Sequence, residues 1–316
     1  METMYWWGIP TLFRCEHNKN LSECDIALAG VPHSTGNGTT ERDQHLGPRA
    51  VRHVSAGLRR VHLDFNINPW KKKKIFDIGD VALPHANNNE RCIEDITNFY
   101  TKIANDRKPV VSIGGDHSIT GGILQGLGSN NLEMTKGKKI SFLHIDAHTD
   151  TFTQLDHFMG AKKSAAHWGA YLVDQGIIDP KTSMQIGMRG NPRSLDWLQP
   201  SYDLGYNVVT MEEFKKRGIK DVIDQTIEKI GDNPVYITFD LDSLDATVAP
   251  AVSNIEPGFT GFTIDEAKEL IQSVKNKNVI GGDVVCLMPT KDQKNNITSM
   301  VAASIMFEII SVIAYK

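Results

Sequence analysis

Three short motifs in the chain combine carboxylates and imidazoles in patterns that could do chemistry. Their side chains are Asp116 and His117 in SIGGDHS, Asp146, His148 and Asp150 in HIDAHTD, and Asp240, Asp242 and Asp245 in TFDLDSLD. Residues two apart in an extended chain share one face, so each of the last two motifs presents several potential ligands to the same side. Each motif follows an apolar run that is typical of a buried strand.

If these strands are neighbours, four carboxylates and two imidazoles converge. Burying one unpaired carboxylate already costs on the order of several kcal/mol, so the cluster needs a counter-charge. Two divalent cations would neutralise four aspartates, with Asp146 and Asp240 bridging ions roughly 3.5–4 Å apart. A water molecule between the ions would be acidified and would act as hydroxide near neutral pH. Oxygen ligands with two imidazoles and no thiolate favour Mn²⁺, Ni²⁺ or Co²⁺ over structural zinc.

Each motif also has an ordinary interpretation. A lone DxHxD pattern is more often a polar strand end than a metal site. The DxD pattern is common in loops and helix caps. The GGDHS segment could be a tight turn in which Gly114 and Gly115 provide backbone freedom. The joint occurrence of all three motifs at strand ends favours the metal site.

Apolar runs alternate with helical patterns along the chain. The predicted strands are residues 24–32, 73–81, 108–116, 138–146, 183–190, 206–211, 234–240 and 278–287. Apolar spacings of three and four predict helices at 47–61, 90–106, 218–231, 263–276 and 297–315. Thr263 and Glu266 fit a capping box. This alternation predicts an α/β protein with a doubly wound, mostly parallel sheet in three layers.

The bulk composition bounds the class of protein. The 316 residues contain neither a repeat nor a low-complexity linker, so residues 1–316 are expected to form a single domain. The net charge of −4 suggests no basic surface for nucleic acid. The N-terminus has no signal-like pattern, and the longest apolar stretch, residues 300–315, is interrupted by Glu308 and judged too short to span a membrane. Four scattered cysteines indicate reduced thiols and a cytoplasmic location.

The motifs together resemble those of the ureohydrolase family, which comprises arginase, agmatinase and related hydrolases of guanidino compounds. The resemblance begins at AGVPHSTGNGTTERDQHLGPRAVR (29–52), passes through the three motifs and QIGMRG, and ends near GGDVVCLMPTKDQ (281–293). The FDLDSLD and VVCLMPTKDQ segments are closer to agmatinase-like members than to arginase. The family implies an arginase-like sheet of eight parallel strands and a homo- or hetero-oligomer, either a trimer or a hexamer.

The resemblance implies a role for each matching residue. One ion would be held by His117, Asp146, Asp150 and Asp240, and the other by Asp146, His148, Asp240 and Asp242. Asp150 would also accept a proton from the bridging water. His167, in AAHWGA, matches the histidine of the family's HG motif and would carry a proton to the leaving nitrogen. Its ordinary alternative is a histidine beside a helix, bonded to the backbone.

The chain departs from the family on the substrate side. Where the family has the glutamate that binds the guanidinium cation, this chain has Cys286, which cannot form a bidentate carboxylate clamp. We interpret Cys286 as a small apolar residue at a strand end rather than as a nucleophile. The altered loop 250–262 gains Glu256, which would restore a carboxylate to the pocket or face solvent. Trp168, directly after His167, would add an aromatic wall.

The predicted activity is metal-dependent hydrolysis of a C–N bond in a linear amidine, with a small cationic guanidino-type substrate and two Mn²⁺ or Ni²⁺ ions per chain. The altered clamp favours an atypical substrate such as a biguanide, with metformin cleaved to guanylurea and dimethylamine. One alternative is an agmatinase- or guanidinobutyrase-like enzyme that releases urea and an amine. The other is a non-catalytic partner subunit of a hetero-oligomeric ureohydrolase, against which the presence of all six predicted ligands argues.

Overall fold

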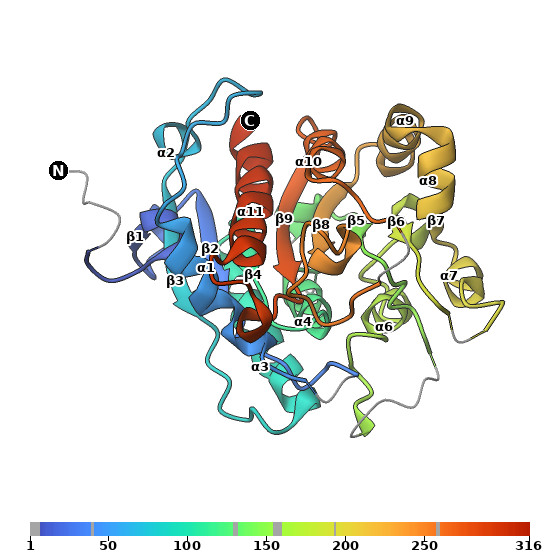
Figure 1. Ribbon diagram of the computed structural model, residues 1–316. Coiled ribbons are helices and arrows are strands. Elements are labelled where there is room, and N and C mark those ends of the chain that lie inside the picture. Colours follow the sequence, from blue (N-terminus) through green and yellow to red (C-terminus); the bar gives the residue numbers. More distant parts are fainter. Residues whose placement is uncertain (1–6, 39–40, 129–131, 154–159, 193, 257–259) are drawn as a thin grey trace.

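A single twisted sheet runs through the middle of the molecule, as the computed structural model in Figure 1 shows. The structure describes residues 7–38, 41–128, 132–153, 160–192, 194–256 and 260–316. The strands are β1 (Glu16–His17), β2 (Ile26–Gly30), β3 (Ile75–Asp80), β4 (Val110–Ile113), β5 (Ser141–Ile145), β6 (Met184–Met188), β7 (Asn207–Thr210), β8 (Pro234–Asp240) and β9 (Asn278–Val285). Their order in the sheet is β1-β3-β2-β4-β9-β8-β5-β6-β7, and every neighbouring pair is parallel.

All eight strands predicted from the sequence are present. They are nearly continuous in apolar residues because helices cover both faces of the sheet, as is usual for parallel sheets. The ninth strand, β1, has only two residues, and both are exposed. Its sequence therefore carries no apolar pattern, and it extends the sheet by one strand beyond the eight that the family resemblance implied.

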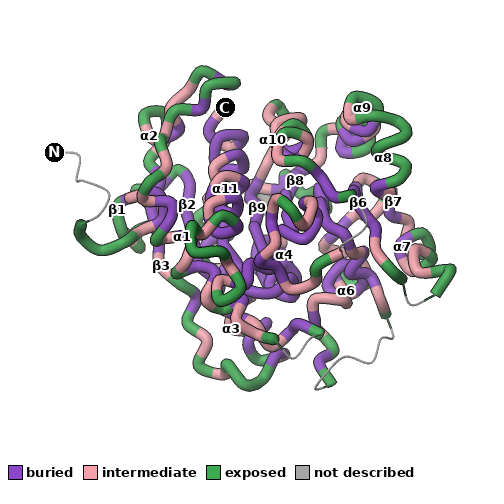
Figure 2. The backbone as a smooth tube through the Cα atoms, viewed as in Figure 1, coloured by how far each residue is buried: buried purple, intermediate pink, exposed green. Residues whose placement is uncertain are grey.

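Helices form a layer on each face of the sheet. Their bounds are α1 (Gly47–Ser55), α2 (Pro69–Lys72), α3 (Asn89–Asn105), α4 (Ser118–Gly128), α5 (Leu132–Thr135), α6 (Trp168–Asp174), α7 (Gln199–Leu204), α8 (Met211–Arg217), α9 (Ile219–Ile230), α10 (Ile264–Gln272) and α11 (Ile297–Tyr315). One hydrophobic core joins the sheet to α1, α8, α9, α10 and α11, and a second joins it to α3, α4 and α6. The burial pattern in Figure 2 follows these two cores, which confirms the three-layer α/β fold.

The five helices predicted from the sequence are also present, although α1 ends at Ser55 instead of continuing to residue 61. The capping box that opens α10 is confirmed, with Thr263 Oγ1 accepting the Glu266 N–H and Glu266 accepting the Thr263 N–H. Helix α4 was not predicted. Its sequence, SITGGILQGLG, is buried at every residue except Gln125 and Gly128, so it has no polar face to produce a helical period.

Helix α11 corrects one expectation. Among the described residues it is the one helix that is long and apolar enough, by length and composition, to cross a membrane, so this segment is not too short. In the fold, 72% of its apolar window is buried, and it packs on the sheet beside α1 and β9. Its Glu308 lies 2.9 Å from the buried His62. The helix therefore has the environment of a core helix.

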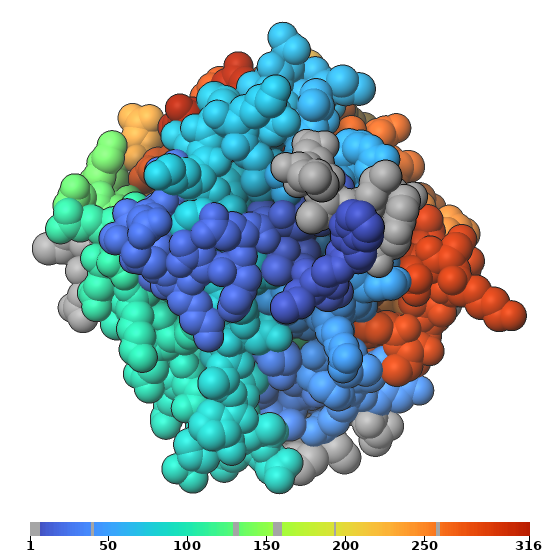
Figure 3. Space-filling view, turned by 90° about the vertical axis from the view of Figure 1, so that its left-hand side faces the viewer, coloured from blue at the N-terminus to red at the C-terminus, as the bar shows by residue number. Residues whose placement is uncertain are grey.

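The β1 edge of the sheet is covered by the N-terminal part of the chain, blue to cyan in Figure 3. The Leu12 N–H donates to Asp77 Oδ2 at 2.8 Å, and the Arg52 guanidinium lies 2.9 Å from the same oxygen. Asp77 sits in β3, so this carboxylate ties α1 and the N-terminal segment to the strand next to the edge. The acidic motifs lie instead at the carboxyl ends of the central strands β4, β8 and β5.

Candidate active site

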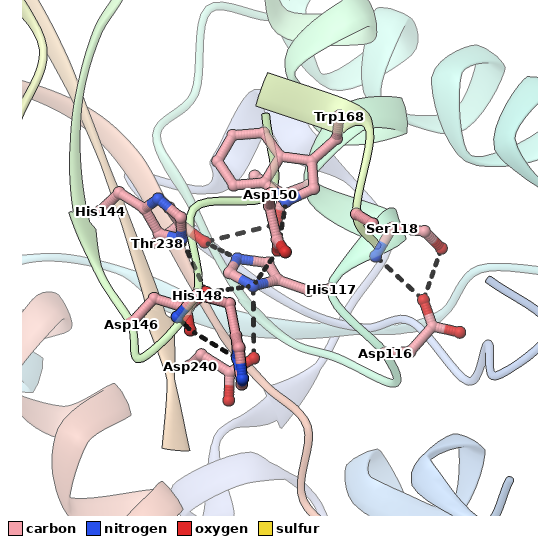
Figure 4. Close-up of polar contacts among 12 residues, drawn as sticks. Asp116, His117, Ser118, His144, Asp146, His148, Asp150, Trp168, Thr238 and Asp240 are labelled. Carbon is pink, nitrogen blue, oxygen red and sulfur yellow. Dashed lines mark hydrogen bonds and ion pairs between the residues drawn. The ribbon is translucent and has the colours of Figure 1, made fainter. Parts of the chain in front are cut away.

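The three acidic motifs meet at the carboxyl ends of neighbouring strands. In sheet order, β4, β9, β8 and β5 stand side by side. His117 lies in the turn between β4 and α4, Asp146 directly follows β5, and Asp240 ends β8. Residues from three distant parts of the chain are thereby brought together, as Figure 4 shows.

One half of the cluster surrounds His117. Its Nδ1 lies 2.9 Å from Asp146 Oδ2, 3.0 Å from Asp150 Oδ2 and 3.3 Å from Asp240 Oδ2. All four residues are buried. This grouping matches the set of ligands predicted for one ion.

The other half surrounds His148, whose Nδ1 lies 3.5 Å from Asp146 Oδ1 and 3.3 Å from Asp242 Oδ2. Asp146 therefore turns one carboxylate oxygen to each half, which is the placement expected of a bridging ligand. Asp240 turns Oδ2 to His117, while its Oδ1 accepts the Asp242 N–H at 2.9 Å. Asp146 therefore meets the geometry predicted for a bridging ligand more clearly than Asp240 does.

The residues fit a pair of metal ions. His117 Nδ1 is buried and makes no hydrogen bond, although three carboxylate oxygens lie within 3.3 Å of it. A ring nitrogen facing three carboxylates requires a cation between them, whether a proton or a metal ion. The donors are imidazole nitrogen and carboxylate oxygen, the set that suits Mn²⁺, Ni²⁺ or Co²⁺.

The charges of the cluster are strongly coupled. Burial alone would lower the pKa of His117, but the carboxylates of Asp146, Asp150 and Asp240 raise it well above its ordinary value. The His148 side chain is 32% exposed; its partial burial would lower its pKa, but Asp242 and Asp146 raise it well above the ordinary value. The pKa of Asp242 is itself raised by burial and by the neighbouring Asp240. In the absence of metal, protons therefore occupy this cluster.

Metal binding is expected to compete with these protons. A metal ligand must be deprotonated, and groups with raised pKa values hold their protons to higher pH, so affinity for Mn²⁺ should weaken as pH falls. Isothermal titration in buffers of different ionisation enthalpy would show net proton release on binding. An affinity independent of pH between 6 and 9, with no proton release, would contradict this prediction.

His144 belongs to the same cluster and was missed by the sequence analysis. Its Nε2 donates to Asp146 Oδ2 at 2.8 Å, and its Nδ1 accepts from Gln185 Nε2 at 3.2 Å. The sequence contained a pattern that could have identified it, because His144, Asp146 and His148 are each two residues apart. Its position inside an apolar strand concealed it. It orients the carboxylate that both halves share.

Trp168 does not form the aromatic wall that we expected. Its side chain is fully buried beneath the cluster, tilted against His117 at 5.1 Å between ring centroids. Its indole N–H donates to Asp150 Oδ2 at 2.9 Å, so it orients a carboxylate instead of contacting substrate. Phe152 and Trp197 are aromatic residues that do line the neighbouring cavity.

His167 is buried at the start of α6. Its Nδ1 lies 2.6 Å from Ser164 Oγ, which fixes the orientation of the ring. The preceding residues Ala165 and Ala166 line the cavity. Its predicted role as a proton carrier stays a prediction.

The two remaining acidic residues of the motifs, Asp116 and Asp245, hydrogen-bond to groups outside the cluster. Asp116 accepts from Ser118 N and Oγ and from Gly36 N, which shapes the turn before α4. Asp245 accepts from Thr247 N and Oγ1. Neither carboxylate reaches the cluster through these contacts.

A cavity of about 590 Å³ adjoins the cluster. Its lining includes His148, Asp150, Asp242, Glu256 and Cys286. The Cys286 backbone has φ of 69°, a strained conformation for a residue other than glycine and one that is common at functional sites. Burial and the nearby Asp240 and Asp242 raise the pKa of the Cys286 thiol well above its ordinary value, so the thiol is neutral.

Glu256 faces the cavity, not bulk solvent. Its Oε1 lies 3.2 Å from His148 Nε2, and its side chain is 19% exposed. The hydrogen bond from His148 lowers the pKa of the Glu256 carboxyl, so the group stays charged. Residues 257–259 of the altered loop lie outside the described residues.

The two glycines of GGDHS serve close packing and not backbone freedom. Neither has a positive φ. A Cβ on Gly115 would lie 1.6 Å from the His33 carbonyl oxygen, and one on Gly114 would lie 2.2 Å from Ile119 Cδ1. The turn that carries His117 therefore packs directly against a neighbouring backbone.

The fold and the cluster are those of an α/β protein with residues able to hold two metal ions, and comparisons with known proteins specify its family. Residues 24–311 match the arginase family. A mitochondrial guanidino acid hydrolase of Homo sapiens is 32% identical over 96% of this chain and 82% of that protein. A guanidinopropionase of Pseudomonas aeruginosa is 30% identical over 97% of this chain and 92% of its own length. The structure of proclavaminate amidino hydrolase from Streptomyces clavuligerus superposes with a TM-score of 0.88, at 28% identity, and covers 99% of both chains.

The chain belongs to the arginase family, among its agmatinase-like members. It is a metal-dependent hydrolase acting on C–N bonds. The family resemblance drawn from the sequence motifs is thereby confirmed.

Proposed function

We propose that this protein hydrolyses a C–N bond of a small guanidino-type substrate with the help of two Mn²⁺ or Ni²⁺ ions. The observation that carries the proposal is the placement of Asp146 between His117 and His148, with one carboxylate oxygen toward each. When bound, two divalent ions supply Lewis-acid chemistry that acidifies water and polarises the guanidino carbon. The protein's own residues then position substrate and protons.

Asp150 is the proton acceptor in this proposal. It lies at the cavity wall beside His117, and the Trp168 N–H fixes its Oδ2. His167, oriented by Ser164, would deliver a proton to the leaving nitrogen. The oxygen of the attacking water would form a bond to the guanidino carbon while Asp150 takes the water proton, and the C–N bond would break as the leaving nitrogen, protonated by His167, departs as the amine.

Two substrate classes fit this chemistry. The first is a linear guanidino compound, such as agmatine or a guanidino acid, which would yield urea and an amine; relatives with these activities support it. The second is a biguanide such as metformin, which would yield guanylurea and dimethylamine. The neutral thiol at Cys286 favours it, because a delocalised cation with apolar methyl groups has less need of a carboxylate there. In both cases Glu256 would supply the remaining negative charge at the cavity wall.

A substrate panel tests the proposal. Protein loaded with Mn²⁺ or Ni²⁺ would be assayed with agmatine, 4-guanidinobutyrate, 3-guanidinopropionate, guanidine, arginine and metformin, and urea, guanylurea and amine would be measured separately. Turnover of any of them supports a guanidino hydrolase. Urea from agmatine without amine from metformin rejects the biguanide. Fewer than two ions per chain together with no turnover would instead support a non-catalytic subunit.

Cys286→Glu is expected to shift the ratio of kcat/KM toward linear guanidinium substrates and away from metformin by about tenfold or more. The reason is that a hydrogen bond to a charged group contributes about 1.5–3 kcal/mol. The matched control is Cys286→Gln, which has the same length without the charge. An equal shift in both variants would show that size and not charge is responsible.

We also propose that the chain assembles as a trimer or hexamer, alone or with a second subunit, in the cytoplasm. All four cysteines are buried and free, which suits a reducing compartment. Mass photometry of the purified protein measures the assembly directly.

A further inference from the structure

A buried acid lies behind the cluster and takes no part in the proposed reaction. Asp283, in β9, is fully buried. Its carboxylate accepts three hydroxyl groups: Thr238 at 2.6 Å, Thr120 at 2.8 Å and Tyr236 at 2.9 Å. Thr238 lies opposite Asp283 in the register of β8 and β9.

The hydrogen bonds have a direction. The Thr238 hydroxyl donates to Asp283 Oδ1, so its proton points to Asp283. The lone pair of Thr238 Oγ1 then accepts the Nε2–H of His117, 2.8 Å away. Because Nε2 carries the ring proton, the Nδ1 lone pair faces Asp146, Asp150 and Asp240.

We propose that Asp283 acts through Thr238 as a positioning residue, fixing the tautomer and the orientation of His117 toward the ion that it would hold. The proposal rests on the proposed two-metal site. In metal proteins, groups that orient a ligating histidine typically change metal affinity by about 10- to 100-fold when removed. Asp283, in β9, supports His117 through Thr238 of the neighbouring strand β8, in the middle of the sheet.

Strand β8 provides the path. Tyr236, Thr238 and Asp240 alternate along it and share one face. Asp240 ends in the cluster, Thr238 contacts His117, and Tyr236 contacts Asp283. His148 receives the corresponding support directly from Glu256, at 3.2 Å. Each imidazole is thus oriented through its Nε2 by a different partner, Thr238 for His117 and Glu256 for His148.

Thr238→Val tests the proposal, because it removes the hydroxyl while keeping the shape of the side chain. Competition between protein and a fluorescent chelator for Mn²⁺ should show one of the two ions bound about 10- to 100-fold more weakly. Thr238→Ser should restore the affinity. The matched control is Tyr236→Phe, which removes another hydrogen bond to the same carboxylate without touching His117 and should leave both affinities within twofold.

A measurement on the metal-free wild-type protein does not depend on how a variant folds. At a pH where the ring is neutral, long-range ¹H–¹⁵N correlation should show His117 with its proton on Nε2. Either of two results would overturn the proposal that Asp283 positions His117 through Thr238. One is a proton on Nδ1, and the other is that Thr238→Val binds both ions as tightly as the wild type does. If the wild type itself binds no ion, the proposed function fails, which is a separate outcome.

Discussion

Asp146→Asn is expected to abolish binding of both ions together and to lower turnover by more than about 100-fold, the upper end of what loss of a merely supporting group costs. Asp146 turns Oδ2 to His117 and Oδ1 to His148, so one substitution weakens both halves of the cluster. An amide offers one neutral oxygen in place of two charged ones. Metal content after gel filtration, together with turnover of the best substrate from the panel, measures the effect.

The matched control is Asp245→Asn, in the neighbouring DLDSLD motif. The Asp245 carboxylate accepts from Thr247 and lies in the same group of loops, so its loss tests local stability without removing a ligand. Both ions and most activity should remain. If Asp146→Asn kept a full complement of two ions, Asp146 would not be the bridge.

Gly115→Ala is expected to destabilise the fold by more than about 3 kcal/mol, beyond the roughly 1–3 kcal/mol that an extra methylene usually costs in a packed core. The added Cβ would lie 1.6 Å from the His33 oxygen and 2.6 Å from its carbonyl carbon. Both are backbone atoms, so no side-chain rotation relieves the clash. The same turn is held by the Asp116 N–H to His33 and by the Cys286 N–H to Gly115, at 3.0 and 2.8 Å.

Urea denaturation of the variant measures the loss of stability, and Mn²⁺ titration of the remaining folded protein shows whether His117 has moved. Gly57→Ala is the matched control, because a Cβ there meets its nearest atom at 3.5 Å and Gly57 has no positive φ. A variant of Gly115 as stable as the control would mean that the two backbones separate at little cost.

Local sequence patterns were sufficient to predict the eight longer strands and the acidic and imidazole side chains that converge at their ends. A charged residue that interrupts an apolar run is visible, and Asp146 and Asp240 stand at such interruptions. The same reasoning did not identify the functional polar residues that lie inside the apolar runs. His144, Thr238 and Asp283 lie within buried strands. A single polar residue in such an apolar run does not reveal its role until its hydrogen-bond partner in the folded structure is known.

The features of the site that were not predicted from the sequence depend on contacts between segments that are distant along the chain. Trp168 was placed in the pocket because it follows His167 in the sequence, but the packing of α6 against the cluster turns its indole under Asp150. Gly115 appeared to serve a turn, and only the approach of His33 explains it. The orientation of Glu256 likewise depends on His148, which lies 108 residues earlier in the chain.

The position of β9 has a consequence for the order of events during synthesis. This strand, Asn278–Val285, lies in the sheet between β4, which is made much earlier, and β8, the strand that precedes it in the chain. Until it emerges from the ribosome, the segment bearing His117 and the segment bearing Asp240 have no common neighbour to align them. Pairings between such distant segments form slowly. The motifs after β5 and β8, whose strands pair directly, can therefore be aligned before β9 is made, whereas His117 is aligned with them only once β9 has joined the sheet.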